Sequence, residues 1–135
     1  MKKIFLKNLG TGPVTYKSEK ERADFVNAIG RLRAAGGGDC PELAFKGMME
    51  ALNAGPKYGS PMFVFTDASA KDDSAGNMAA LKASAMSNSA TINFFANLGG
   101  CKGRGIQSFK DIASYTSGNL ANDSLKKATF LSRRI

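Results

Sequence analysis

The stretch Met62-Phe63-Val64-Phe65-Thr66-Asp67 decides the fold class, because it joins an uninterrupted apolar run to a terminal acid. An apolar run without polar alternation is typical of a parallel strand covered on both faces. A second such run, residues 91–96, follows a segment rich in alanine and methionine that we expect to be helical over residues 74–87. Strands that alternate with helices predict an α/β fold with a mostly parallel sheet, right-handed crossovers and helices on both faces.

The remaining segments continue this alternation. The apolar stripe Ala23, Phe25, Val26, Ile29 and Leu32 predicts a helix that buries one face, and Ser18 with Glu21 has the spacing of a capping box at its start. This helix is predicted to span residues 18–33. Short strands are predicted at residues 4–6, 14–16 and 118–120, and further helices at residues 41–54, 106–116 and 124–133.

A second acid follows a glycine-rich run, Gly36-Gly37-Gly38-Asp39-Cys40-Pro41-Glu42. Ligands of α/β sheets bind outside the carboxyl ends of the strands, so Asp39 and Asp67 are expected to meet there as a metal or ligand site. Two structural alternatives stay open. Asp39 and Glu42 have the spacing of a capping box on the following helix, and Asp67 suits an Asx turn at a strand end. A phosphate-binding loop is not predicted, because no Gly-Lys-Ser/Thr follows the glycines.

Composition narrows the class of function. The chain has 135 residues, of which 43% are hydrophobic, and we expect residues 1–135 to form one domain. It contains no histidine, so histidine-based catalysis and zinc sites are not expected, and we predict no enzyme activity. The formal charge is +8, but the basic residues are scattered without interleaved aromatic residues, so nucleic-acid binding is only a remote alternative. No apolar run approaches the roughly 18 residues of a membrane span, and the first residues do not predict a signal peptide.

The two acidic segments together resemble the von Willebrand factor A (VWA) domain, and specifically its hemicentin-like extracellular branch. The resemblance is carried by Gly-Gly-Gly-Asp-Cys-Pro-Glu at residues 36–42 and Phe-Thr-Asp-Ala at residues 65–68. It implies a Rossmann-like fold and a divalent-ion-dependent adhesion site that takes Mg²⁺, or Ca²⁺ or Mn²⁺. Asp67 corresponds to the third metal-binding motif of the family, and Asp39 stands at the position of the second. The implied function is a secreted adhesion or matrix module whose protein partner offers an acidic side chain to the cation. The glycosylation sequon Asn122-Asp123-Ser124 is consistent with secretion.

The family's first strand lies in the middle of its sheet and carries an Asp-x-Ser-x-Ser motif, which does not precede Gly36 here. The resemblance therefore implies a domain truncated at its amino end. We expect such a chain to bind Mg²⁺ weakly, if at all, and to self-associate through uncovered strands. The side chains of Ser69, Asp72 and Asp73 are expected to be solvated. The alternative function is a structural VWA-like domain without a metal site that acts by surface packing.

The cysteines add one more implication of the resemblance. Hemicentin-like relatives carry cysteines at the places of Cys40 and Cys101, which implies a Cys40–Cys101 disulfide. The alternative is two free thiols in a reducing compartment.

Overall fold

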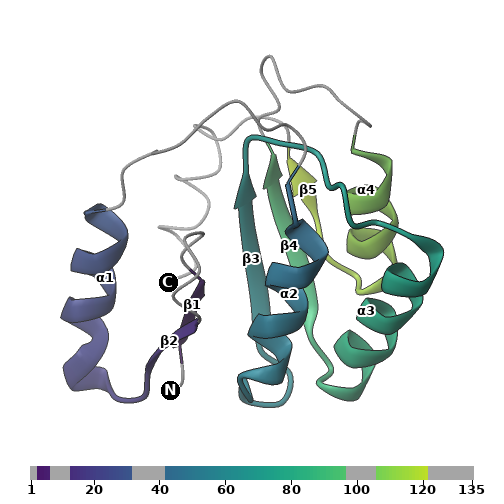
Figure 1. Cartoon of the computed structure of the whole chain (residues 1–135). Coiled ribbons are helices and arrows are strands. Elements are labelled where there is room, and N and C mark those ends of the chain that lie inside the picture. The colour runs from purple at the N-terminus through teal and green to yellow at the C-terminus, as the bar shows by residue number, and fades with distance from the viewer. Residues whose placement is uncertain (1–2, 7–12, 32–41, 97–105, 122–135) are drawn as a thin grey trace.

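A parallel sheet and a separate antiparallel ribbon organise the protein (Figure 1). The structure is a computed structural model and describes residues 3–6, 13–31, 42–96 and 106–121. In the sheet, β4 lies between β3 and β5, and both pairings are parallel, whereas β1 and β2 form the ribbon. The α/β class with a parallel sheet is therefore confirmed. The elements are β1 (Lys3–Leu6), β2 (Pro13–Tyr16), the 3₁₀ helix η1 (Glu19–Glu21), α1 (Arg22–Gly30), α2 (Ala44–Asn53), β3 (Pro61–Thr66), α3 (Ala75–Ser87), β4 (Thr91–Ala96), α4 (Gln107–Tyr115) and β5 (Leu120–Ala121).

One face of the parallel sheet forms the core with α2, α3 and α4. The register places Met62 opposite Ile92 and Val64 opposite Phe94, so alternate side chains of β3 and β4 point to the same side. Phe94 is fully buried and stacks on Phe109 of α4, with ring centroids 4.8 Å apart. The buried members of this cluster are Phe45, Met48, Leu52, Ala70, Leu81, Ala85, Ala90, Ile92, Phe94, Phe109, Ile112 and Ala113. Helices α2, α3 and α4 thus each bury one face in this core.

The other face of the sheet carries an aromatic group, which we call the aromatic face: Phe63, Phe65 and Phe95. Phe95 is only 4% exposed and lies between its neighbours, with ring-centroid distances of 6.2 Å to Phe63 and 4.7 Å to Phe65. Phe63 and Phe65 are 39% and 63% exposed. The prediction of cover on both faces is therefore confirmed for β4 and wrong for β3. Among the described helices, α2, α3 and α4 all pack on the opposite face of the sheet, with Ile92 and Phe94.

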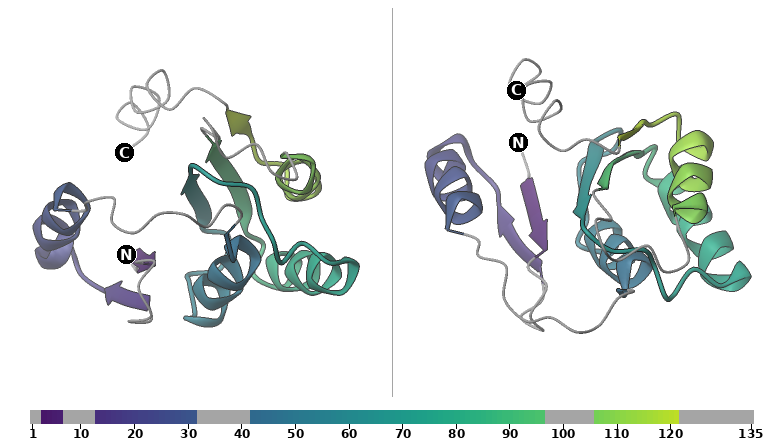
Figure 2. Two further views of the ribbon diagram at one scale, coloured as in Figure 1. Left: turned by 45° about the horizontal axis from the view of Figure 1, so that its top comes forward. Right: turned by 90° about the horizontal axis from the view of Figure 1, so that it is seen from above.

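Helix α1 does not bury the predicted stripe. It lies with the β1–β2 ribbon, apart from the parallel sheet (Figure 2), and Val26 and Ile29 are exposed. Of the described members of the stripe, only Phe25 is half-buried, with its ring edge-on to the Tyr16 ring and the ring centroids 5.4 Å apart. The predicted capping box does not form as expected. The Ser18 side chain makes no cap, and the Glu21 carboxylate accepts from the backbone N–H of Lys17 instead of Ser18. Leu32 and the predicted helix at residues 124–133 lie outside the described residues.

The last strand begins later than predicted because the residues before it serve as a connection. Gly118 follows α4 at a place where an added Cβ would stand 1.9 Å from the Ile92 carbonyl oxygen, so no side chain fits there. Asn119 then joins the sheet through its backbone, with its carbonyl accepting from Phe94 N–H at 2.8 Å and its N–H donating to Asn93 Oδ1 at 3.1 Å. Strand β5 follows at Leu120–Ala121 instead of residues 118–120.

Candidate functional site

Asp67 follows the last residue of β3 at the carboxyl edge of the sheet and is exposed. The turn at this strand end is made by Thr66, whose hydroxyl donates to the Ala68 carbonyl at 2.9 Å and accepts from the Ala68 N–H at 3.2 Å. The Asx-turn alternative for Asp67 is therefore wrong, since the neighbouring threonine takes that role. Within the described part of the chain, the Asp67 carboxylate makes no hydrogen bond or ion pair, so it is available to a ligand.

The loop after Asp67 is joined to the segment that leads into α2. Glu42 pairs with Ala70 in a short parallel bridge. Its N–H donates to the Ser69 carbonyl and its carbonyl accepts from the Lys71 N–H, both at 2.8 Å. Ser69 is fully buried beside this bridge. Two segments that are far apart in sequence, one after Asp39 and one after Asp67, thus run side by side.

Asp72 extends this junction into the first turn of α2. Its Oδ1 accepts from the Phe45 N–H at 3.0 Å and its Oδ2 from the Lys46 N–H at 2.8 Å. These amides have no partner within the helix, and a carboxylate beside them also interacts favourably with the helix dipole. The residue at the N-cap position, Leu43, supplies no side-chain acceptor. Asp72 therefore caps α2 from another loop.

These contacts correct the predicted capping box and the predicted solvation of three side chains. The capping box of Asp39 and Glu42 is wrong, because Glu42 lies in an extended bridge and α2 starts only at Ala44. Ser69 and Asp72 are not solvated, since the first is buried and the second is half-buried against α2, and Asp73 is also half-buried. One signal in the sequence pointed to a distant cap: leucine is a poor N-cap residue, so this helix needs an acceptor from elsewhere. Which acid supplies it depends on the fold.

The described residues offer a divalent cation few donors. Among the described residues, no group of three or more acidic, cysteine or histidine side chains could hold a metal. Asp67 thus contributes one carboxylate, and the Thr66 hydroxyl beside it is engaged by the backbone. Asp39, Cys40 and Cys101 lie outside the described residues. Hard cations bind such oxygen donors with an affinity that rises with the number of protein ligands, so the described residues alone would hold an ion only weakly.

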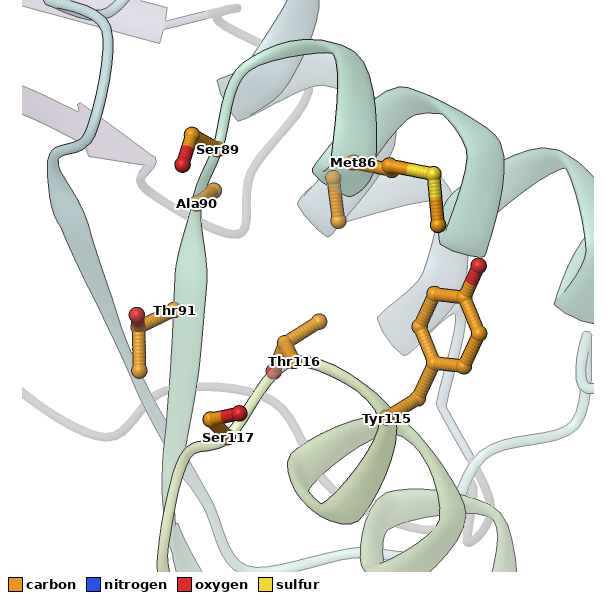
Figure 3. Close-up of a pocket in the computed structure, with 8 residues that line it drawn as sticks. Met86, Ser89, Ala90, Thr91, Tyr115, Thr116 and Ser117 are labelled. Carbon is orange, nitrogen blue, oxygen red and sulfur yellow. The ribbon is translucent and has the colours of Figure 1, made fainter.

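A shallow hollow of about 290 Å³ lies at the opposite, amino end of the sheet (Figure 3). It is lined by Ser89, Thr91 and Ser117 and, from the two flanking helices, by Met86 and Tyr115. No carboxylate lines it. The hollow therefore offers no carboxylate to a hard cation.

The fold is thus a parallel α/β domain with an exposed acid, Asp67, at the carboxyl edge of its sheet, which is the edge where such folds bind their ligands. A family model described as von Willebrand factor A domain matches residues 8–124, and the chain belongs to this family. Neither a curated protein nor a solved structure matches it. Domains of the family mediate protein binding and are commonly extracellular. Of the described helices, none has the length and apolar character to cross a membrane.

Proposed function

We propose that this VWA domain is a secreted, hemicentin-like adhesion or matrix module that binds a protein partner at its carboxyl edge. Asp67 and Asp39 are the cation ligands of this proposal, and Mg²⁺ is the cation. An acidic side chain of the partner would complete the coordination shell. The protein's own part is to hold two carboxylates on adjacent loops.

The bridge between Glu42 and the Asp67 loop is the observation that carries the proposal. Asp67 stands two residues before Ser69, and Asp39 stands three residues before Glu42. The Glu42 N–H donates to the Ser69 carbonyl. Three residues reach at most about 11 Å when fully extended. This tether permits Asp39 to approach Asp67, as a shared cation would require.

A site with two carboxylates as its protein ligands is a weak one for a hard cation. Affinity for hard cations rises with the number and rigidity of the ligands, so we expect a dissociation constant on the order of 10⁻³ M. At an Mg²⁺ concentration ten times higher, binding to the native state alone would add about 1.4 kcal/mol to the free energy of unfolding. That increment is measurable as a rise of a few degrees in melting temperature.

The first test is the melting temperature with and without Mg²⁺. Asp67→Asn should abolish the Mg²⁺-induced rise, because it removes a charged ligand while keeping the shape of the side chain. Asp24→Asn is the matched control, since Asp24 is an exposed acid in the first turn of α1, and it should keep the rise. A wild type that does not respond to Mg²⁺ would favour the alternative, a VWA domain that binds by surface packing alone. The absence of a three-donor cluster among the described residues is the observation behind that alternative.

The Cys40–Cys101 disulfide stays a prediction and joins positions 61 apart (101 − 40). Protein from an oxidising compartment should be about 2 Da lighter before reduction than after it. Reduction should lower the free energy of unfolding by roughly 2–4 kcal/mol, because the open loop gains entropy in the unfolded chain. The Cys40→Ser/Cys101→Ser double variant should lose this response to reductant. Two thiols that alkylate in the native oxidised protein would contradict the pairing.

A further inference from the structure

We propose that Asp72 is a positioning residue of the carboxyl-edge site, one that fixes the loop of Asp67 against the start of α2. The inference rests on the proposed function where it concerns cation affinity. The order of the loop itself is measurable without any cation.

Asp72 lies at the junction of two helices and one loop. Its two carboxylate oxygens receive the second and third amides of α2. Its backbone carbonyl accepts from the Asn77 side-chain amide of α3 at 2.9 Å. The loop from β3 to α3 passes over the first turn of α2 (Figure 1), so one residue ties that loop to both helices.

The neighbouring bonds show what this tie holds in place. At the start of the loop, the Thr66 hydroxyl makes the turn. At the end of the loop, Ser74 caps the first turn of α3 by accepting from the Asn77 N–H at 3.2 Å. Between these points, the loop is joined to Glu42 through Ser69 and Lys71. Asp72 stands next to that bridge and adds two charge-assisted bonds, which are stronger than neutral ones.

A cap supplied from a distance differs from a local cap in what it controls. An acid at position 43 would satisfy the same amides and would leave the loop alone. Asp72 is 27 residues from Phe45, so its removal releases the helix end and the loop together. The two roles can therefore be separated by giving α2 a local cap in a chain that lacks Asp72.

The experiment compares Asp72→Ala, Leu43→Asp, and the double variant. Leu43 is the N-cap residue of α2 and is 49% exposed, so an acid is tolerated there. The readouts are amide hydrogen exchange and the Mg²⁺-induced change in melting temperature. In Asp72→Ala, the first-turn amides of Phe45 and Lys46 and the bridge amides of Glu42 and Lys71 should exchange about tenfold faster than in the wild type.

The double variant decides between the roles. We expect Leu43→Asp to restore the protection of Phe45 and Lys46, while Glu42 and Lys71 stay fast and the response to Mg²⁺ stays reduced. Recovery of all four amides by the local cap would overturn the proposal, since Asp72 would then be only a helix cap. Unchanged exchange at Glu42 and Lys71 in Asp72→Ala would overturn it as well.

Two further variants keep the test sound. Asp72→Asn retains one acceptor oxygen and replaces Asp72→Ala if the alanine variant does not fold. The same four amides should then exchange faster, by a smaller factor. Asp111→Asn is the control, because Asp111 is an exposed acid that accepts from Gln107 Nε2 on α4, and it should leave all four amides unchanged. If the wild type does not respond to Mg²⁺, the proposed function fails, and the exchange pattern still decides the role of Asp72.

Discussion

Serine occupies a left-handed backbone position after two helices, at Ser89 and Ser117, with φ values of 49° and 59°. Each serine follows the C-cap residue of its helix and donates its N–H to the carbonyl three residues back. The next residue closes a longer bond, from Ala90 N–H to the Ala85 carbonyl and from Gly118 N–H to the Ala113 carbonyl. Glycine is the usual residue at this place, because a Cβ is disfavoured in the left-handed region.

Glycine at either position should therefore stabilise the protein. We expect Ser89→Gly and Ser117→Gly each to raise the free energy of unfolding by about 0.5–1 kcal/mol, measured by urea denaturation. Ser87→Gly is the control, because Ser87 is an exposed residue within α3 and glycine there should cost about 0.5–1 kcal/mol. If Ser89→Gly lowered stability as much as Ser87→Gly, the backbone argument would be contradicted.

At the scale of elements, local signals predicted α3, β4 and α4 to within one residue at each end. Residues 74–87, 91–96 and 106–116 correspond to Ala75–Ser87, Thr91–Ala96 and Gln107–Tyr115. These elements follow from their own periodicity and, for α3, from the cap at Ser74. The start of α2 was missed because its cap comes from Asp72, which the sequence does not connect to it. The exposure of the α1 stripe was missed because periodicity shows which side chains share a stripe and does not show what covers the stripe.

The aromatic face gives the prediction that belongs to this scale. Phe65 is 63% exposed on β3, and an exposed apolar edge strand favours association between copies. We expect Phe65→Thr to reduce self-association, as measured by sedimentation velocity. The loss of the stack on Phe95 should cost about 0.5–1.5 kcal/mol of stability.

A second exposed aromatic residue provides the control for that experiment. Tyr58 is 76% exposed and lies outside the aromatic face, so Tyr58→Thr should leave the sedimentation profile unchanged. Equal association of the wild type and Phe65→Thr would show that the aromatic face is not the surface that mediates it.

At the scale of the whole molecule, the α/β class and the position of Asp67 could be predicted from the sequence. An apolar run that ends on an acid is enough to place that acid at the carboxyl edge of a parallel sheet. The junction of Glu42, Asp72 and the Asp67 loop could not be predicted, because it joins residues about 27 positions apart. Leu43 indicates only that the cap comes from elsewhere, and the backbone bonds of Glu42 carry no sequence signal. Asp39 and the two cysteines lie outside the described residues, so their roles stay predictions.

The most direct test of the central claim is the paramagnetic broadening of amide signals by Mn²⁺, which stands in for Mg²⁺ and affects only nearby nuclei. At low Mn²⁺ concentration, we predict that the amides of Asp67, Ala68 and Glu42 broaden first, and that Asp67→Asn removes this effect. The amides of Ser89 and Ser117, at the other end of the sheet, should keep their intensity. Broadening that is strongest at that end, or equal around exposed acids such as Asp24 and Asp111, would contradict a cation site at the carboxyl edge.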